Sequence, residues 1–250
     1  MYVIGLILSA AIGLSLGLIG GGGSILTVPI LVYFLGVDAH EAVGMSLAVV
    51  GATSVFGSYL HFKRGNLNFP AGLLFGIAGI VGAFLGSPLT TRVAPNILLL
   101  IFGALMFVVA VSMLWRKNYS ETDAPRQQVL WKALAAGFGV GVLTGFLGVG
   151  GGFLIVPALV MFGGLAMKEA IGTSLFVIFL NCVAGLIGHA SQNHFDWSLT
   201  GQVMLLAVGG AVVGTILSHR IAAHRLQTLF AVLVLAVSVF LFVKNYTVLF

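Results

Sequence analysis

The sequence predicts an all-α integral membrane protein of two inverted repeats, and three observations support this fold class. Of the 250 residues, 60% are hydrophobic and only 7% are charged, whereas a soluble domain carries about a quarter charged residues. The apolar residues form blocks of helical length, and a chain of this size holds about 8 to 10 spanning helices. The second half of the chain also repeats the motifs of the first. A soluble globular protein is therefore excluded.

The duplication is visible without gaps, because each matched residue pairs with the one 128 positions later. The first repeat is expected to span residues 1–115 and the second 131–250, with a polar linker at 116–130 between them. The matched pairs are Gly17 with Gly145, Pro29 with Pro157, Glu41 with Glu169, Ser46 with Ser174, Gly57 with Gly185, His61 with His189, Gly82 with Gly210 and Arg92 with Arg220.

Glycine, proline and polar breaks delimit five helices in the first repeat. In order, the first ends at a glycine run, the second is short, and the third ends at a Lys-Arg pair. The fourth follows Asn68, and the fifth follows Pro95. Their expected ranges are 2–19, 25–35, 42–62, 69–91 and 96–115.

The second repeat has the same five helices in the same order. Its second block, like that of the first repeat, is too short to cross about 30 Å of hydrocarbon comfortably. Each repeat is therefore expected to contain one half-helix, preceded by a glycine break. The expected ranges are 131–147, 153–165, 170–190, 197–219 and 226–243.

The positive charges indicate whether the chain turns back at each glycine break. With an even number of crossings per repeat, Lys and Arg split seven against four between the two sides. If each break forms a hairpin, the split becomes nine (63, 64, 116, 117, 126, 132, 168, 220 and 225) against two (92 and 244). The positive-inside rule favours the hairpin, which inverts the repeats. Both termini are then predicted to be periplasmic and the linker cytoplasmic, in a bacterial or archaeal cell (inner) membrane.

The two glycine runs are the first candidates for a functional site. Small residues also permit close helix packing, which is the simpler interpretation. However, consecutive glycines disfavour helix continuation, and irregular backbone at membrane depth is tolerated only where protein or a watery cavity covers it. Half-helices starting near Ser24 and Gly152 would present uncapped N–H donors and partial positive charge, which suits a small anion. The predicted substrate-binding residues are Gly20, Gly22, Gly23, Ser24, Gly148, Gly150, Gly151 and Gly152.

Polar residues of the third helix in each repeat extend this candidate site. Alternatively, a Ser or Thr hydroxyl inside a helix bonds the carbonyl one turn back and has no further role. No carboxylate lies deep inside an apolar block, which argues against a cation or metal pathway. Glu41 and Glu169 are instead expected to be helix-end residues. The candidates for substrate binding are Ser46, Thr53, Thr173, Ser174 and Asn181.

His61 and His189 are the titratable residues of the repeat suited to proton coupling. Inverted symmetry would place them at opposite faces of the membrane. The alternative is an interfacial histidine bonded to a loop carbonyl.

With these motifs in place, the sequence resembles the sulfite exporter TauE/SafE family of membrane permeases. The resemblance rests on Gly20-Gly-Gly-Gly-Ser-Ile-Leu-Thr-Val-Pro29 and Gly148-Val-Gly-Gly-Gly-Phe-Leu-Ile-Val-Pro157, and on the Glu-Ala-x-Gly-x-Ser-Leu motifs at 41–47 and 169–175. It implies secondary transport of sulfite, a sulfonate or a related organic anion. Val149 stands where the first break has Gly21, so the two half-sites are not equivalent.

Four other classes of function compete with a carrier. A membrane scaffold for another protein is disfavoured because the small loops offer little docking surface. An anion channel would use the same helix-end chemistry. An intramembrane enzyme is disfavoured because Ser46 and His61 would lie over about 20 Å apart on one helix. Nucleic-acid binding is disfavoured because the cations form no cluster. The single cysteine, Cys182, excludes an internal disulfide and a Cys-rich zinc site. The expected partners are the lipid bilayer, a small anion and a coupling proton or sodium ion, with no cofactor.

Overall fold

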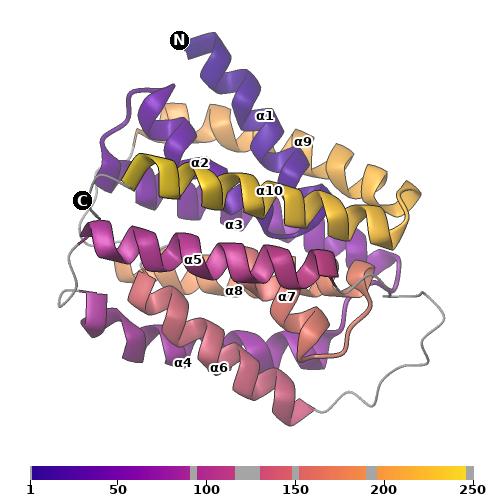
Figure 1. Cartoon of the computed structure of the whole chain (residues 1–250). Helices are drawn as coiled ribbons and strands as arrows, with labels where there is room; N and C mark the ends of the chain where they lie inside the picture. The colour runs from indigo at the N-terminus through magenta and orange to yellow at the C-terminus, as the bar shows by residue number, and fades with distance from the viewer. Residues whose placement is uncertain (1, 91–94, 116–129, 148–151, 190–195, 246–250) are drawn as a thin grey trace.

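The computed structural model describes residues 2–90, 95–115, 130–147, 152–189 and 196–245, and these contain ten helices (Figure 1). The all-helical prediction is confirmed, and most boundaries agree to within a few residues. The helices are α1 (Tyr2–Ile19), α2 (Gly22–Tyr33), α3 (Ala39–Lys63), α4 (Phe69–Thr90), α5 (Pro95–Trp115), α6 (Leu130–Leu147), α7 (Gly152–Met161), α8 (Met167–His189), α9 (Trp197–Arg220) and α10 (Ala223–Asn245).

The first glycine break is shorter than expected. α2 begins at Gly22 and not near Ser24, so only Gly20 and Gly21 stand outside a helix. Gly22 and Gly23 form the first turn of α2, where the N–H groups have no intrahelical partner. The glycines therefore weaken the helix less there than they would in its interior. Gly20 has a φ of +79°, a left-handed conformation that ends α1.

The chain turns back at this break, as the charge distribution predicted. A Cβ on Gly5 of α1 would lie 2.5 Å from Leu35 Cδ2, just after α2, and one on Gly23 would lie 2.3 Å from the carbonyl oxygen of Ile12. The start of α1 therefore faces the end of α2, which makes the pair an antiparallel hairpin.

Equivalent helices of the two halves run in opposite directions (Figure 1). Gln227 Nε2 of α10 donates to the Met113 carbonyl of α5 at 2.7 Å, while Ser238 Oγ donates to the Gly103 carbonyl at 2.8 Å. α3 and α8 are antiparallel as well, since Gly57 packs on Leu175 and Gly185 packs on Leu47. The repeats are therefore inverted.

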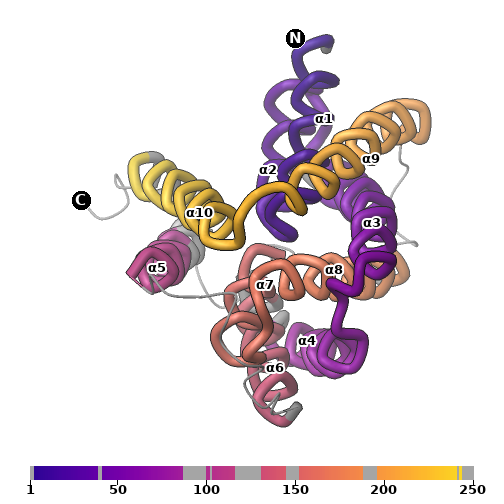
Figure 2. Tube along the Cα trace, turned by 90° about the vertical axis from the view of Figure 1, so that its right-hand side faces the viewer, coloured from indigo at the N-terminus to yellow at the C-terminus, as the bar shows by residue number. Residues whose placement is uncertain are grey.

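Two close parallel pairs, α1 with α9 and α4 with α6, lie at opposite edges of the molecule, with α2 and α7 between them (Figure 2). In the first pair a Cβ on Gly13 would lie 1.7 Å from the Ala207 carbonyl oxygen. In the second, a Cβ on Gly141 would lie 2.2 Å from the Gly79 carbonyl oxygen. Each pair joins one repeat to the other.

Among the described residues, five helices are long and apolar enough to cross a membrane. The half-helix α7 is enclosed by protein, with residues 152–160 all buried. The irregular backbone of Gly20 and Gly21 is buried as well, which shields it from lipid. The five candidate spans are Glu41–Lys63, Phe69–Gly86, Met167–Ile187, Trp197–Arg220 and Ala223–Phe240.

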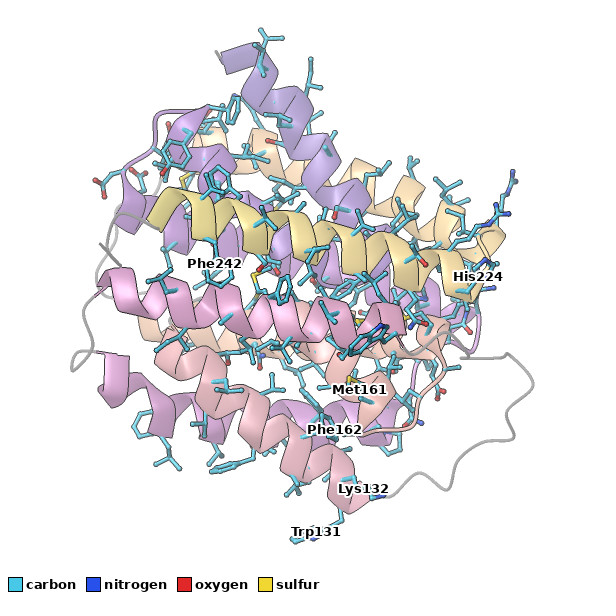
Figure 3. All side chains as sticks on the ribbon, in the orientation of Figure 1. Trp131, Lys132, Met161, Phe162, His224 and Phe242 are labelled. Carbon is cyan, nitrogen blue, oxygen red and sulfur yellow. The ribbon has the colours of Figure 1, made fainter. Side chains whose placement is uncertain are left out.

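Charge is distributed unequally between the two ends of the bundle. We call the end where α5 finishes and α6 begins the linker end, and the opposite end the terminus end (Figure 1). Lys132 and His224 mark the linker end in Figure 3, while Phe242 lies toward the terminus end. Every Lys and Arg side chain that the structure describes belongs to the linker end, namely Lys63, Arg64, Lys132, Lys168, Arg220 and Arg225.

Candidate functional site

The tips of the two helical hairpins meet at the centre of the molecule. A Cβ on Gly21 would lie 2.3 Å from the Gly152 carbonyl oxygen, and one on Gly152 would lie 2.5 Å from Ser24 Oγ. Ser24 and Gly152 are equivalent positions of the two repeats, so this contact lies near the axis that relates them. We call the residues that meet here the hairpin junction: Gly20, Gly21, Ser24, Gly152 and Ser174.

Ser174 joins α8 to the first break. Its hydroxyl lies 3.0 Å from the Gly20 carbonyl oxygen and 2.8 Å from that of Ile171, one turn back along α8. The side chain is fully buried. A bond from one repeat to the break of the other requires the inverted packing, which sequence spacing alone could not reveal.

The N-terminus of α2 lies at the junction without a side-chain cap. Gly21 is its N-cap residue and makes no side-chain cap hydrogen bond to the first turn. The Ser24 hydroxyl donates instead to the Gly21 carbonyl at 2.7 Å. Gly22 and Gly23 are buried, so their N–H groups concentrate partial positive charge inside the protein. This arrangement can bind a small anion.

α7 provides the equivalent helix start from the second repeat. It begins at Gly152, as expected. The other candidates of the second break, Gly148, Gly150 and Gly151, lie outside the described residues.

Ser15 lies beside the junction and was missed by the sequence reasoning, whereas Gly21 belongs to the glycine run that was already a candidate. Ser15 Oγ has no hydrogen-bond partner among the described residues, and the side chain is only 9% exposed. A Cβ on Gly22 would lie 3.2 Å from this hydroxyl, which places it beside the start of α2. Ser15 has Leu143 as its counterpart, so a search for polar residues in both repeats could not find it.

Of the other predicted site residues, Ser46 and Thr53 bond within their own helix. Ser46 donates to the Val43 carbonyl at 2.7 Å, as the alternative interpretation expected. Thr53 donates to carbonyls of the preceding turn. Thr173 accepts a hydrogen bond from the backbone N–H of Asn68 at 3.0 Å, next to the start of α4. The buried Asn181 Oδ1 has no partner among the described residues.

Glu41 and Glu169 lie in the first turns of α3 and α8, which confirms their assignment to helix ends. Glu41 Oε1 accepts from the backbone N–H of Asp196 at 2.9 Å, and Glu169 Oε1 accepts from Asn68 Nδ2 at 3.0 Å. Asn68 and Asp196 are equivalent residues, 128 positions apart. Each carboxylate therefore ties its helix to the residue preceding α4 or α9 of the other repeat.

His61 is buried at the linker end of α3, facing a histidine that the sequence reasoning missed. Its ring centroid lies 4.8 Å from that of His219 on α9, with the ring planes at 47°. The described contacts show no hydrogen bond from a ring nitrogen of His61 to a loop carbonyl, and the backbone group that acts on its ring is that of Gly17 on α1. His189 ends α8 at the opposite end, and its side chain is outside the described part.

The molecule is a helical bundle of two inverted repeats whose helical hairpins meet at its centre, and this arrangement defines its class. It is a multi-pass membrane protein with the internal symmetry found in many transporter folds.

The chain belongs to the sulfite exporter TauE/SafE family, and the sequence model of that family matches residues 5–241. It is 34% identical over 241 residues to a probable membrane transporter protein of Xylella fastidiosa (strain 9a5c), covering 94% of this chain and 92% of the relative. It is 30% identical over 207 residues to the probable membrane transporter protein YdhB of Bacillus subtilis (strain 168), covering 81% and 84%. It is also 30% identical over 194 residues to the probable membrane transporter protein MJ0441 of Methanocaldococcus jannaschii, covering 75% and 72%.

Proposed function

We propose that the protein is a secondary membrane transporter for a small anion, namely sulfite, a sulfonate or a related organic anion. The observation that carries the proposal is the uncapped, buried start of α2, which meets the start of α7 at the hairpin junction. Backbone N–H groups at a helix start bind anions through both hydrogen bonds and partial charge. The family description, sulfite exporter, favours an oxyanion of sulfur.

Alternating access follows from the inverted repeats. Because the repeats are similar and inverted, each can adopt the conformation of the other. This exchange gives two arrangements of similar packing, one open to each side of the membrane. Substrate bound at the junction would lie near the axis between the repeats, where a small rocking movement opens one side and closes the other. The bond between Ser174 and the Gly20 carbonyl crosses this boundary and would break or re-form during the cycle.

The relatives favour a transporter over a channel or an enzyme. Each relative cited above is described as a probable membrane transporter protein. A nucleophilic pair of Ser46 and His61 is disfavoured because Ser46 bonds its own helix and His61 lies at the other end of α3. The flux experiment described below distinguishes a channel from a carrier.

The charge distribution supports an orientation in the bacterial or archaeal cell (inner) membrane. The described basic side chains belong to the linker end, while Asp38, Glu41 and Asp196 lie at the terminus end. By the positive-inside rule the linker end is cytoplasmic, and both termini are periplasmic.

Flux in proteoliposomes tests the function. Purified protein should accumulate labelled sulfite with saturable kinetics, with competition by sulfonates and dependence on an imposed proton or sodium gradient. If protons are the coupling ion, His61→Gln and His189→Gln should weaken uptake driven by a pH gradient. Passive current without saturation would support a channel, and absence of flux for sulfite and sulfonates would contradict the substrate class.

A further inference from the structure

Four residues near the linker end form a polar cluster separate from the hairpin junction. We call it the histidine cluster: His61 at the end of α3, Asn66 in the following loop, and Thr215 and His219 on α9. The two imidazole rings face each other at 4.8 Å, and Asn66 Nδ2 lies 3.3 Å from His219 Nδ1. Thr215 and His219 are one helical turn apart, so they share a face of α9.

The cluster contains buried polar groups without partners among the described residues. Because Asn66 Nδ2 donates to Nδ1, a neutral His219 carries its proton on Nε2, which has no acceptor among the described residues. The hydroxyl of the fully buried Thr215 is also unpartnered among the described residues, while the backbone of Gly17 acts on the buried ring of His61. Buried polar groups without partners are destabilising, so a ligand that accepts their hydrogen bonds would stabilise the cluster.

The charges around the cluster are positive. Arg64 and Lys168 both act electrostatically on His219, and Arg64 also acts on His61. Glu169, next to Lys168 in sequence, accepts a hydrogen bond from Asn68 Nδ2. Unsatisfied donors in a positive environment favour an anion over a cation.

The cluster lies between the linker end and the hairpin junction. A Cβ on Gly17 of α1 would lie 2.7 Å from the backbone nitrogen of Thr215, and Gly20 of the junction follows three residues later. On α8, a Cβ on Gly172 would lie 2.7 Å from His61 Cβ, and Ser174 of the junction follows two residues later. Of the four cluster residues, Asn66 and His219 are partly exposed at the linker end.

We infer that the histidine cluster is a second binding site for the transported oxyanion, on the route between the junction and the linker end. The inference rests on the proposed function, because it takes the same substrate class. An anion released from the N–H groups of α2 would next meet the imidazole and hydroxyl donors of this cluster.

Equilibrium binding of radiolabelled sulfite to the full chain in lipid nanodiscs tests the inference. The unaltered protein should bind two sulfite ions per chain. Thr215→Val, which keeps side-chain volume, and His219→Leu should each weaken one site at least tenfold. Asn66→Asp should do the same, because its carboxylate would pair with His219 in place of the ligand. His224→Leu is the matched control, since His224 is exposed at the same end on α10 (Figure 3).

A fifth variant separates the two sites. Gly22→Leu places a side chain against Leu233 and Ser15 at the junction, and it should retain the site at the cluster. Two-site binding that is unchanged by all three cluster variants would overturn the inference and leave the proposed function intact. A single site that is lost with Gly22→Leu would also overturn it. Failure of the unaltered protein to bind sulfite would contradict the proposed function as well.

Discussion

Gly20 and Gly21 are needed at the first break for different physical reasons. Gly20 adopts a φ of +79°, which side chains other than glycine rarely take. Gly21 has a negative φ of −151°, but its α-carbon faces the Gly152 carbonyl at a distance that leaves no space for a methyl group. The close-packing interpretation of the glycine run therefore applies to Gly21, whereas Gly20 is required by the left-handed turn that ends α1.

Gly21→Ala should destabilise the hairpin junction. Its Cβ would lie 2.3 Å from a backbone oxygen, so the hairpins must separate, at a cost typical of overpacking, about 1–3 kcal/mol. Thermal unfolding of the purified protein in detergent measures the effect. Gly139→Ala on α6 is the control, because a Cβ there meets open space. Equal melting temperatures for both variants would show that the tips do not pack as described.

Ser15→Ala should weaken substrate affinity and leave the fold unchanged. A hydrogen bond to a charged group contributes about 1.5–3 kcal/mol, which corresponds to about a 10- to 150-fold change in affinity. The KM for sulfite uptake measures this. Ser9→Ala is a matched control on the same helix, because Ser9 is buried and its hydroxyl bonds only the Gly5 carbonyl. If the two variants have the same KM, Ser15 does not contact substrate.

At the scale of helices, the parallel pairs depend on small residues that face the neighbouring backbone. Gly210 of α9 packs on α1, where a Cβ would lie 2.1 Å from the Ala10 carbonyl oxygen, whereas a Cβ on its neighbour Gly209 would meet nothing within 4 Å. In lipid the hydrophobic effect does not drive helices together, because lipid tails are as apolar as the side chains. The close approach of the backbones instead provides the van der Waals contact that joins the two helices.

Gly210→Val should therefore destabilise the protein, and Gly209→Val should not. The first substitution forces α1 and α9 apart, while the second adds a side chain to an exposed surface. The melting temperature in detergent is expected to fall by several degrees only for Gly210→Val. Equal melting temperatures would contradict the close pairing of α1 with α9.

The helices were predictable because glycine, proline and polar residues interrupt otherwise continuous apolar blocks. α1 was predicted without error, but α2 was placed too late, since its first turn consists of residues that also break helices. The pairing of His61 with His219 could not be predicted. It joins different repeats, and His219 has no histidine counterpart at the equivalent position, which is Thr91.

At the scale of the whole molecule, the unequal charge of the two ends predicts its orientation. In intact cells, a membrane-impermeant maleimide should label Asp38→Cys at the terminus end and should spare Arg225→Cys at the linker end. Labelling of Arg225→Cys should require permeabilised cells. The unaltered chain is the control, because its single cysteine, Cys182, is buried. The reverse pattern would place the linker end outside.

The central claim is that the substrate anion binds the N–H groups at the start of α2. Selenite has the shape and charge of sulfite and contains a heavy atom, so anomalous scattering from crystals soaked in selenite locates it directly. We expect a selenium peak at the hairpin junction with its oxygens within about 2.7–3.2 Å of the nitrogens of the first turn of α2, and none there in Gly22→Leu crystals. A protein that transports selenite but shows no peak at the junction would contradict the claim.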